Sequence, residues 1–140
     1  MTADQIHLVR KSFLRIDAMG HVAALVFYRR LFELAPELRR LFTSDIEAQS
    51  KKLTDMLGAA IAMLTNPGEL KATLEALGAR HVQYGAKPEH YETVGTALLD
   101  MLASVLGAEF TPETRQAWTK LLSNISNAML AGAVKVTEAA

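Results

Sequence analysis

Three polar side chains occupy positions in this sequence where apolar residues are expected: Tyr28, Gln49 and His81. Each falls on a repeat of apolar residues that has the spacing of one helix face, so each is expected to point inward. Burying a polar group costs free energy unless the group finds a partner. An inward imidazole is suited to binding iron, and an inward phenol or amide is suited to donating a hydrogen bond to a small ligand.

Each of the three side chains also has an ordinary structural explanation. His81 suits a core histidine bonded to a backbone carbonyl, and Gln49 suits a half-exposed residue in the first turn of a helix. Tyr28 suits a core aromatic whose hydroxyl needs only one partner. Taken together, however, the three describe two helices that each offer a donor to a pocket and a third helix that offers an imidazole. The spacing alone leaves both interpretations open.

The metal chemistry available to this chain is narrow. It has no cysteine, which excludes disulfides, thiolate ligation of zinc or iron–sulfur clusters, and a cysteine nucleophile. His7, His21 and His90 lie at no metal-ligand spacing to His81. One protein ligand cannot hold a bare metal ion, but it can hold an ion that a macrocycle already chelates. Phosphate-binding glycine motifs, a serine elbow and an H-E-x-x-H motif are also missing from the sequence.

Helices must position these side chains. Glycine and proline divide the chain, and every segment between them repeats its apolar residues with a period of about 3.6. There is no convincing alternation typical of a strand and no internal repeat. We therefore predict an all-α fold with five long helices and short pieces between them. The apolar residues expected to face inward near the three polar ones are Leu25, Leu31, Phe32, Leu53, Met56, Leu57, Leu74, Leu77, Tyr91, Val94 and Leu98.

Capping residues and prolines indicate where the helices begin. Thr2 and Gln5 have the spacing of a capping box. The cluster Thr43, Ser44 and Asp45 is expected to cap the helix that carries Gln49.

The composition is typical of one soluble domain. The chain has 140 residues, of which 50% are hydrophobic and 21% charged, so we expect residues 1–140 to form a single domain. Lys and Arg number 15, as do Asp and Glu, and this balance argues against nucleic acid or an acidic membrane as partner. No apolar run approaches the roughly 20 residues of a membrane span, and the charged N-terminal segment is unlike a signal peptide. We expect a cytoplasmic protein, and the sequence leaves its oligomeric state open.

Four segments of the sequence, in this order, resemble the globin family. Leu31 to Phe42, LFELAPELRRLF, resembles the corner between the second and third globin helices. RHVQYG (80–85) and HYETVG (90–95) resemble the proximal-histidine region of bacterial haemoglobins. FTPETR followed by AWTK (110–120) resembles the start of the last helix. The chain is similar over nearly its whole length to single-domain bacterial haemoglobins, flavohaemoglobin haem domains and neuroglobins. This implies a globin fold with helices packed around a haem pocket.

On the proximal side, the resemblance implies that His81 is the haem-iron ligand and that Tyr91 matches a tyrosine of the bacterial family. The implied cofactor is haem b. Flavohaemoglobins place a glutamate late in the last helix, linked to the proximal imidazole through the tyrosine network, whereas this chain has Ala133 there. The imidazole is therefore expected to be less anionic, which weakens the case for peroxidase-like O–O cleavage.

On the distal side, the resemblance implies that Tyr28 and Gln49 occupy the positions of the ligand-binding donors. Leu53, one turn after Gln49, would lie over the haem face. Phe42 matches the aromatic residue that packs on the haem at the corner. Lys52 suits either a contact with a haem propionate or an ordinary solvated lysine. Because glutamine binds iron weakly, we expect a five-coordinate ferrous haem with an open sixth position.

Three functions are compatible with these site residues, and we assign no catalytic residue for any of them. The first is a haem protein that binds dioxygen reversibly, with nitric oxide and carbon monoxide as other gaseous ligands. A hydrogen bond from a buried donor to a partly anionic ligand is worth about 1.5–3 kcal/mol, or roughly ten- to a hundredfold in affinity. The second is a nitric oxide dioxygenase that depends on a separate reductase. The third is a globin-fold interaction module without haem, in which side chains fill the pocket.

Overall fold

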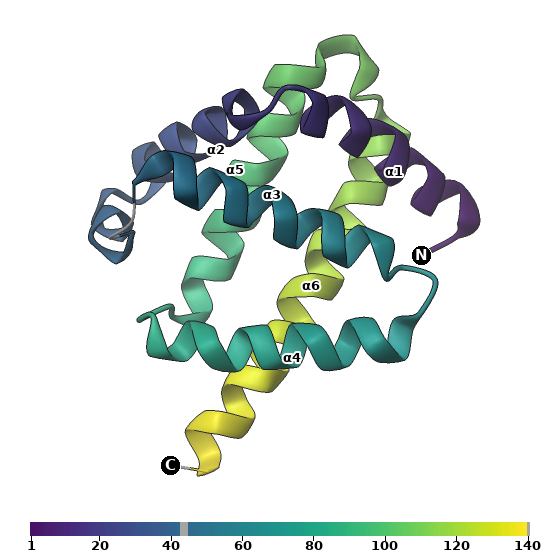
Figure 1. Cartoon of the computed structure of the whole chain (residues 1–140). Helices are drawn as coiled ribbons and strands as arrows, with labels where there is room; N and C mark the ends of the chain where they lie inside the picture. The colour runs from purple at the N-terminus through teal and green to yellow at the C-terminus, as the bar shows by residue number, and fades with distance from the viewer. Residues whose placement is uncertain (43–44, 140) are drawn as a thin grey trace.

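The structure, a computed structural model, describes residues 1–42 and 45–139. Helices account for nearly all of this part of the chain, and it contains no strand, so the all-α prediction is confirmed (Figure 1). In chain order the elements are α1 (Ala3–Ala18), α2 (His21–Leu34), the 3₁₀ helix η1 (Pro36–Leu41), α3 (Ile46–Ala62), α4 (Pro67–Gln83), α5 (Pro88–Leu106), the 3₁₀ turn η2 (Gly107–Glu109) and α6 (Pro112–Ala139).

The helix boundaries follow the capping chemistry of the sequence. Thr2 and Gln5 form the expected capping box, in which the Gln5 N–H donates to the Thr2 hydroxyl at 3.1 Å and the Thr2 N–H donates to the Gln5 side chain at 3.0 Å. Asp45 caps α3 by accepting a hydrogen bond from the Ala48 N–H at 2.9 Å. Thr43 and Ser44, expected as further capping residues, lie outside the described residues.

The number of long helices was predicted wrongly. The described residues form six α-helices rather than five, although the glycine at position 20 already indicates in the sequence that α1 and α2 are separate. Gly20 lies between them with φ 63° and ψ −134°, a conformation that a residue with a side chain adopts only at a cost. The chain therefore changes direction at Gly20, and α2 starts as a new helix.

The buried face of α2 also differs from the prediction at one residue. Leu25 was expected to face inward, yet it is 42% exposed. The fully buried residues of α2 are Ala23, Ala24, Phe27, Tyr28 and Leu31. Ala24, Phe27, Tyr28 and Leu31 have the i, i+3, i+4, i+7 spacing of one helix stripe, and Leu25 lies outside it.

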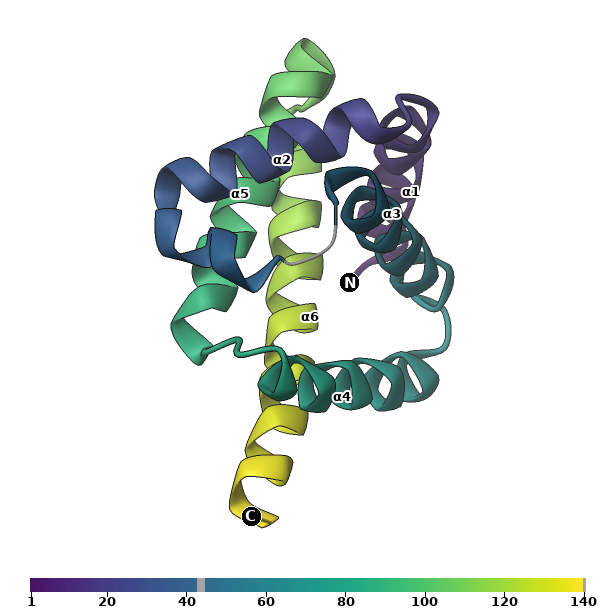
Figure 2. The same ribbon diagram turned by 60° about the vertical axis from the view of Figure 1, so that its left-hand side comes forward.

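The helices pack in pairs around a common core. α4 packs against α6, α2 against α5, and α1 against α6. A buried hydrogen bond from the Trp118 indole N–H to the Ser12 hydroxyl, 2.7 Å long, joins α1 to α6 inside the core. Figure 2 shows α4 crossing α6, whose C-terminal turns extend past the crossing. None of the helices described has the combination of length and apolar character that crossing a membrane requires.

Candidate functional site

His81 lies in the last turn of α4, and one of its ring nitrogens already makes a hydrogen bond. Its Nδ1 is 2.8 Å from the carbonyl oxygen of Leu77. Because a carbonyl oxygen only accepts, Nδ1 carries the hydrogen and donates it, which leaves the lone pair on Nε2. Nε2 makes no hydrogen bond to any described residue. The bond to a backbone carbonyl, which favoured an ordinary core histidine, therefore also prepares this imidazole to bind a metal.

The surroundings of His81 keep the ring neutral. Burial, the largest effect, lowers the pKa of His81 below its ordinary value, and the positive charge of Arg80 acts in the same direction. The hydrogen bond to Leu77 opposes this lowering but does not cancel it. A metal ligand must be the neutral imidazole, and this is the form that the site favours.

Tyr28 is buried on α2, with 4% of its surface exposed. Its ring packs edge-on against Phe42, with 5.4 Å between centroids, and against Phe27, with 4.9 Å. Burial raises the pKa of Tyr28 to about 12, so the phenol keeps its hydrogen at neutral pH. The hydroxyl donates that hydrogen to the backbone carbonyl of Gln49 at 3.2 Å. The structure thus brings Tyr28 and Gln49 together, but with the phenol bonded to the backbone of α3.

Gln49 lies in the first turn of α3, where its N–H donates to the Asp45 carbonyl at 3.1 Å. Its side chain is half-buried and its amide makes no hydrogen bond to a described residue. Leu53, one turn further, is also half-buried. Lys52 is exposed and makes no ion pair with the described residues, whereas its neighbour Lys51 pairs with Asp55 on α3.

The inward stripes of α3 and α5 are fully buried at one end and only half-buried at the other, and in the stripe of α4 only Leu74 is fully buried. The fully buried members are Leu57, Ala60, Leu74, Leu98 and Met101, and the half-buried members are Gln49, Leu53, Met56, Leu77, His81, Tyr91 and Val94. α4 has α6 as its main packing partner rather than α3. The candidate residues of α3, α4 and α5 are thus mostly apolar, half-buried and packed at the margin of the core.

The donor set of this site fits a metal that brings its own chelator. Within residues 1–42 and 45–139, no group of three or more His, Asp or Glu side chains is placed to hold a metal ion. A lone neutral imidazole among half-buried apolar side chains does not retain a bare ion. It suits an ion whose other positions are filled by a flat macrocycle, and the half-buried leucines and Phe42 offer apolar surface to such a group.

Comparison with known proteins agrees with this geometry. A protein-family model described as Globin matches residues 25–129, which is most of the chain and includes every candidate site residue. The chain belongs to the globin family. This globin is similar to proteins named flavohemoprotein from Bacillus subtilis (30% identical over 128 residues), Xylella fastidiosa (32% over 125) and Vibrio cholerae (27% over 122). These matches cover 89%, 87% and 85% of the chain, but only 32%, 31% and 31% of the relatives. The chain therefore spans about a third of the length of those flavohemoproteins.

In the part of the chain that the structure describes, the surroundings of His81 lack the tyrosine–glutamate network that the resemblance to flavohaemoglobins led us to compare. Tyr91 is half-buried on α5, and burial raises its pKa. No hydrogen bond joins Tyr91 to His81 among the described residues, and Ala133 on α6 has no carboxylate to offer. The acceptor for the imidazole N–H is the Leu77 carbonyl, a neutral group.

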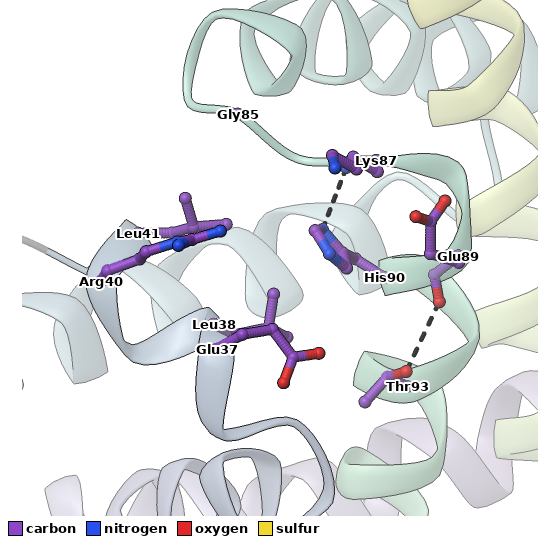
Figure 3. A pocket seen from close by; sticks show the side chains of 9 residues that line it. All are labelled: Glu37, Leu38, Arg40, Leu41, Gly85, Lys87, Glu89, His90 and Thr93. Atoms are coloured by element: carbon purple, nitrogen blue, oxygen red, sulfur yellow. Dashed lines mark hydrogen bonds between the residues drawn. The ribbon is translucent and has the colours of Figure 1, made fainter.

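A pocket in this globin is lined by none of the candidate ligands. It has a volume of about 250 Å³ and lies between η1 and the start of α5, where Arg40 extends toward His90 (Figure 3). The Lys87 N–H donates to His90 Nδ1 at 3.0 Å, so His90 caps α5. The pocket contains none of the residues expected to bind haem. His90 is thus explained by the helix end that it caps.

Three contributors to the site were not assigned to it from the sequence. Phe32 stacks on Tyr28 with 6.0 Å between centroids, and the Tyr84 ring meets the His81 ring edge-on at 5.4 Å. Phe32 is four residues after Tyr28 and Tyr84 is three after His81, so helical spacing was an available signal. The third, the Leu77 carbonyl, has no signal in the residue type, because every residue offers a backbone acceptor.

Proposed function

We propose that this globin binds haem through His81 and binds dioxygen reversibly. The observation that carries the proposal is the state of His81: a neutral imidazole whose Nδ1–H is donated to the Leu77 carbonyl and whose Nε2 makes no hydrogen bond to a described residue. The similarity to proteins named flavohemoprotein supports haem as the group that His81 binds. Haem, when bound, supplies a ferrous iron to which a diatomic gas binds.

The residues around His81 and Gln49 would orient the macrocycle and exclude water. The hydrogen bond from His81 to Leu77 fixes the plane of the imidazole. Phe42 is held edge-on by Tyr28 and by Phe32, with centroids 5.4 and 5.6 Å away, so it presents a fixed aromatic surface at the corner. Leu53 supports the opposite wall, and exposed Lys52 is proposed to reach a propionate.

Two distal donors act differently in this proposal. The Gln49 amide makes no hydrogen bond to a described residue and is available to the ligand directly. The Tyr28 hydroxyl has one hydrogen, which it already donates to the Gln49 carbonyl. To donate to the ligand, Tyr28 must give up that bond. The two donors would therefore contribute unequally to the retention of a bound ligand.

Replacement of His81 tests the proposal. The purified wild-type protein is expected to show a Soret band after haem addition, a five-coordinate ferrous spectrum without oxygen and a reversible change with oxygen. His81→Ala is expected to lose stable haem retention. His21→Ala is the matched control, because His21 is exposed on α2, and it should behave as wild type. Absence of a Soret band in the wild type would favour the interaction-module alternative, and full haem retention by His81→Ala would contradict the assignment of the ligand.

A nitric oxide dioxygenase is the alternative function, and similarity to flavohemoproteins is the observation in its favour. The neutral acceptor for His81 favours ligand binding over O–O cleavage, because a carbonyl withdraws the imidazole proton less than a carboxylate does. Nitric oxide added to the oxygenated protein with a generic reductase separates the two functions. Sustained nitrate production would support the enzyme, and one stoichiometric burst would support an oxygen-binding protein.

A further inference from the structure

α4 and α6 touch through their backbones at two glycines. A Cβ atom built on Gly78 would lie 1.9 Å from the carbonyl oxygen of Met129, and one built on Gly132 would lie 1.9 Å from the carbonyl oxygen of Glu75. Real Cβ contacts stay above 3.0 Å. The two contacts are reciprocal, since each glycine admits a carbonyl of the other helix. No residue with a side chain fits at either position in this arrangement.

The crossing lies in the part of α4 that carries the candidate ligand. Gly78 immediately follows Leu77, the hydrogen-bond acceptor of His81, and precedes His81 by three residues. Those residues belong to one continuous hydrogen-bonded helix, Pro67–Gln83. Both ribbon views show α4 lying across α6 (Figures 1 and 2), and α6 is its main packing partner. The distance between α4 and α6 at the crossing therefore determines the position of the His81 imidazole.

We propose that Gly78 and Gly132 are positioning residues for His81: the glycine crossing sets how far the imidazole stands from the macrocycle. This inference rests on the proposed ligation of haem by His81. A Cβ at either glycine must separate the helices by at least about 1 Å to restore an ordinary contact. A metal–imidazole bond accepts a change of only about 0.2 Å, so the displacement cannot be absorbed without weakening the bond.

The ion pair beside the crossing does not perform this role. Lys135 Nζ on α6 lies 3.1 Å from Glu75 Oε1 on α4, with side-chain exposures of 69% and 19%. A pair with one partner in solvent contributes little and has long, flexible side chains. The direct backbone contact is rigid by comparison. Removal of the ion pair should therefore leave the position of His81 unchanged.

Gly132→Ala is the decisive variant, because Gly132 is on α6 and belongs to no ligand-binding element of the site. In the haem-loaded protein, loss of haem to an excess of a haem-scavenging apoprotein is expected to become at least about tenfold faster. The iron–histidine stretch in the resonance Raman spectrum of the ferrous protein is expected to shift. Gly68→Ala is the matched control in α4, since a Cβ there meets no atom within 4 Å, and both readouts should stay at their wild-type values.

A second pair of variants, both carrying His81→Gly, separates an effect on the position of the imidazole from a general loss of protein stability. In His81→Gly supplied with free imidazole, the ligand is no longer attached to α4, so adding Gly132→Ala should not shift the iron–imidazole stretch. An equal shift in both backgrounds would overturn the proposal, as would a wild-type stretch and haem loss in Gly132→Ala alone. If haem in the wild-type protein is not bound through His81, the proposed function is wrong, and this outcome is distinguishable from a failure of the glycine proposal alone.

Lys135→Ala keeps the test decisive if Gly132→Ala does not fold. It retains both glycines and removes only the exposed end of the ion pair. Its iron–histidine stretch and haem loss are expected to match the wild type. A shift in that variant would show that the side-chain pair sets the position of α4, and would contradict the role given to the glycines.

Discussion

Replacement of Tyr28 by phenylalanine tests the distal side of the site, because it removes one hydroxyl from a fixed ring. Tyr28 is packed against Phe27, Phe32 and Phe42, so the ring of the variant should keep its place. The hydroxyl donates to the Gln49 carbonyl at 3.2 Å, which is longer than the 2.5–3.0 Å usual for such a bond. The carbonyl is also within α3 and keeps its helical partner, so the substitution leaves no buried group unpaired.

The size of the effect follows from the exchange of one bond for another. A hydrogen bond from a neutral donor to a partly anionic ligand is worth about 2 kcal/mol, and a long phenol–carbonyl bond about 0.5 kcal/mol. The net gain from Tyr28 is then about 1.5 kcal/mol, or about tenfold in the rate of ligand dissociation. The Gln49 amide has no bond to give up, so Gln49→Leu should accelerate dissociation by about thirtyfold.

The rates are measured by mixing the oxygenated protein with an excess of carbon monoxide and following the replacement of dioxygen. Thr96→Val serves as the control for removal of a hydroxyl outside the site, because Thr96 is exposed on α5, and its rate should equal that of the wild type. An unchanged rate in Tyr28→Phe would show that the phenol stays bonded to Gln49. A larger effect from Tyr28→Phe than from Gln49→Leu would refute the reasoning about the exchanged bond.

Other predictions concern the stability of the fold. Burial raises the pKa of Tyr28 to about 12, above the pKa of the same group in the unfolded chain. The contribution of the neutral phenol to the stability should therefore be complete below pH 10 and disappear toward pH 12. An ultraviolet titration of the phenolates should lose its last step in Tyr28→Phe. Trp118→Phe should lower the free energy of unfolding in urea by about 1–3 kcal/mol, since it leaves the buried Ser12 hydroxyl without its indole donor. Asp100→Asn should leave the unfolding midpoint in urea close to that of the wild type, because Arg30 and Asp100 are both partly exposed and solvent screens the pair.

The sequence predicted the helical elements better than their details. Capping residues, prolines and the period of the apolar residues gave the helix positions, and Leu74 and the stripe from Trp118 to Met129 are buried as expected. Leu25 was misplaced because a leucine at the edge of a stripe satisfies the same periodicity as one at its centre. The helix count was short by one although Gly20, which has φ 63° in the structure, indicates the break between α1 and α2 in the sequence.

The candidate site was predicted in its residue types rather than in its hydrogen bonds. The inward position of His81 follows from spacing, and its half-burial agrees. The acceptors of His81 and Tyr28 are both backbone carbonyls, at Leu77 and Gln49, and residue types carry no information about which carbonyl is used. The crossing at Gly78 depends on two segments far apart in the chain, so no local pattern indicates it. The roles given to Phe42, Leu53, Tyr91 and Lys52 toward haem remain predictions.

The inward faces of α3, α4 and α5 are incompletely buried, so the stability of the folded chain is expected to depend on the supply of a ligand that covers them. A molecule that covers these faces acts as part of the core, and it binds the native chain in preference to the unfolded one. At a thousandfold excess over its dissociation constant, such a molecule adds about 4 kcal/mol to the stability, against roughly 5–15 kcal/mol for a whole domain. The abundance of this protein would then follow, by mass action, the amount of its prosthetic group that the organism can synthesise or acquire.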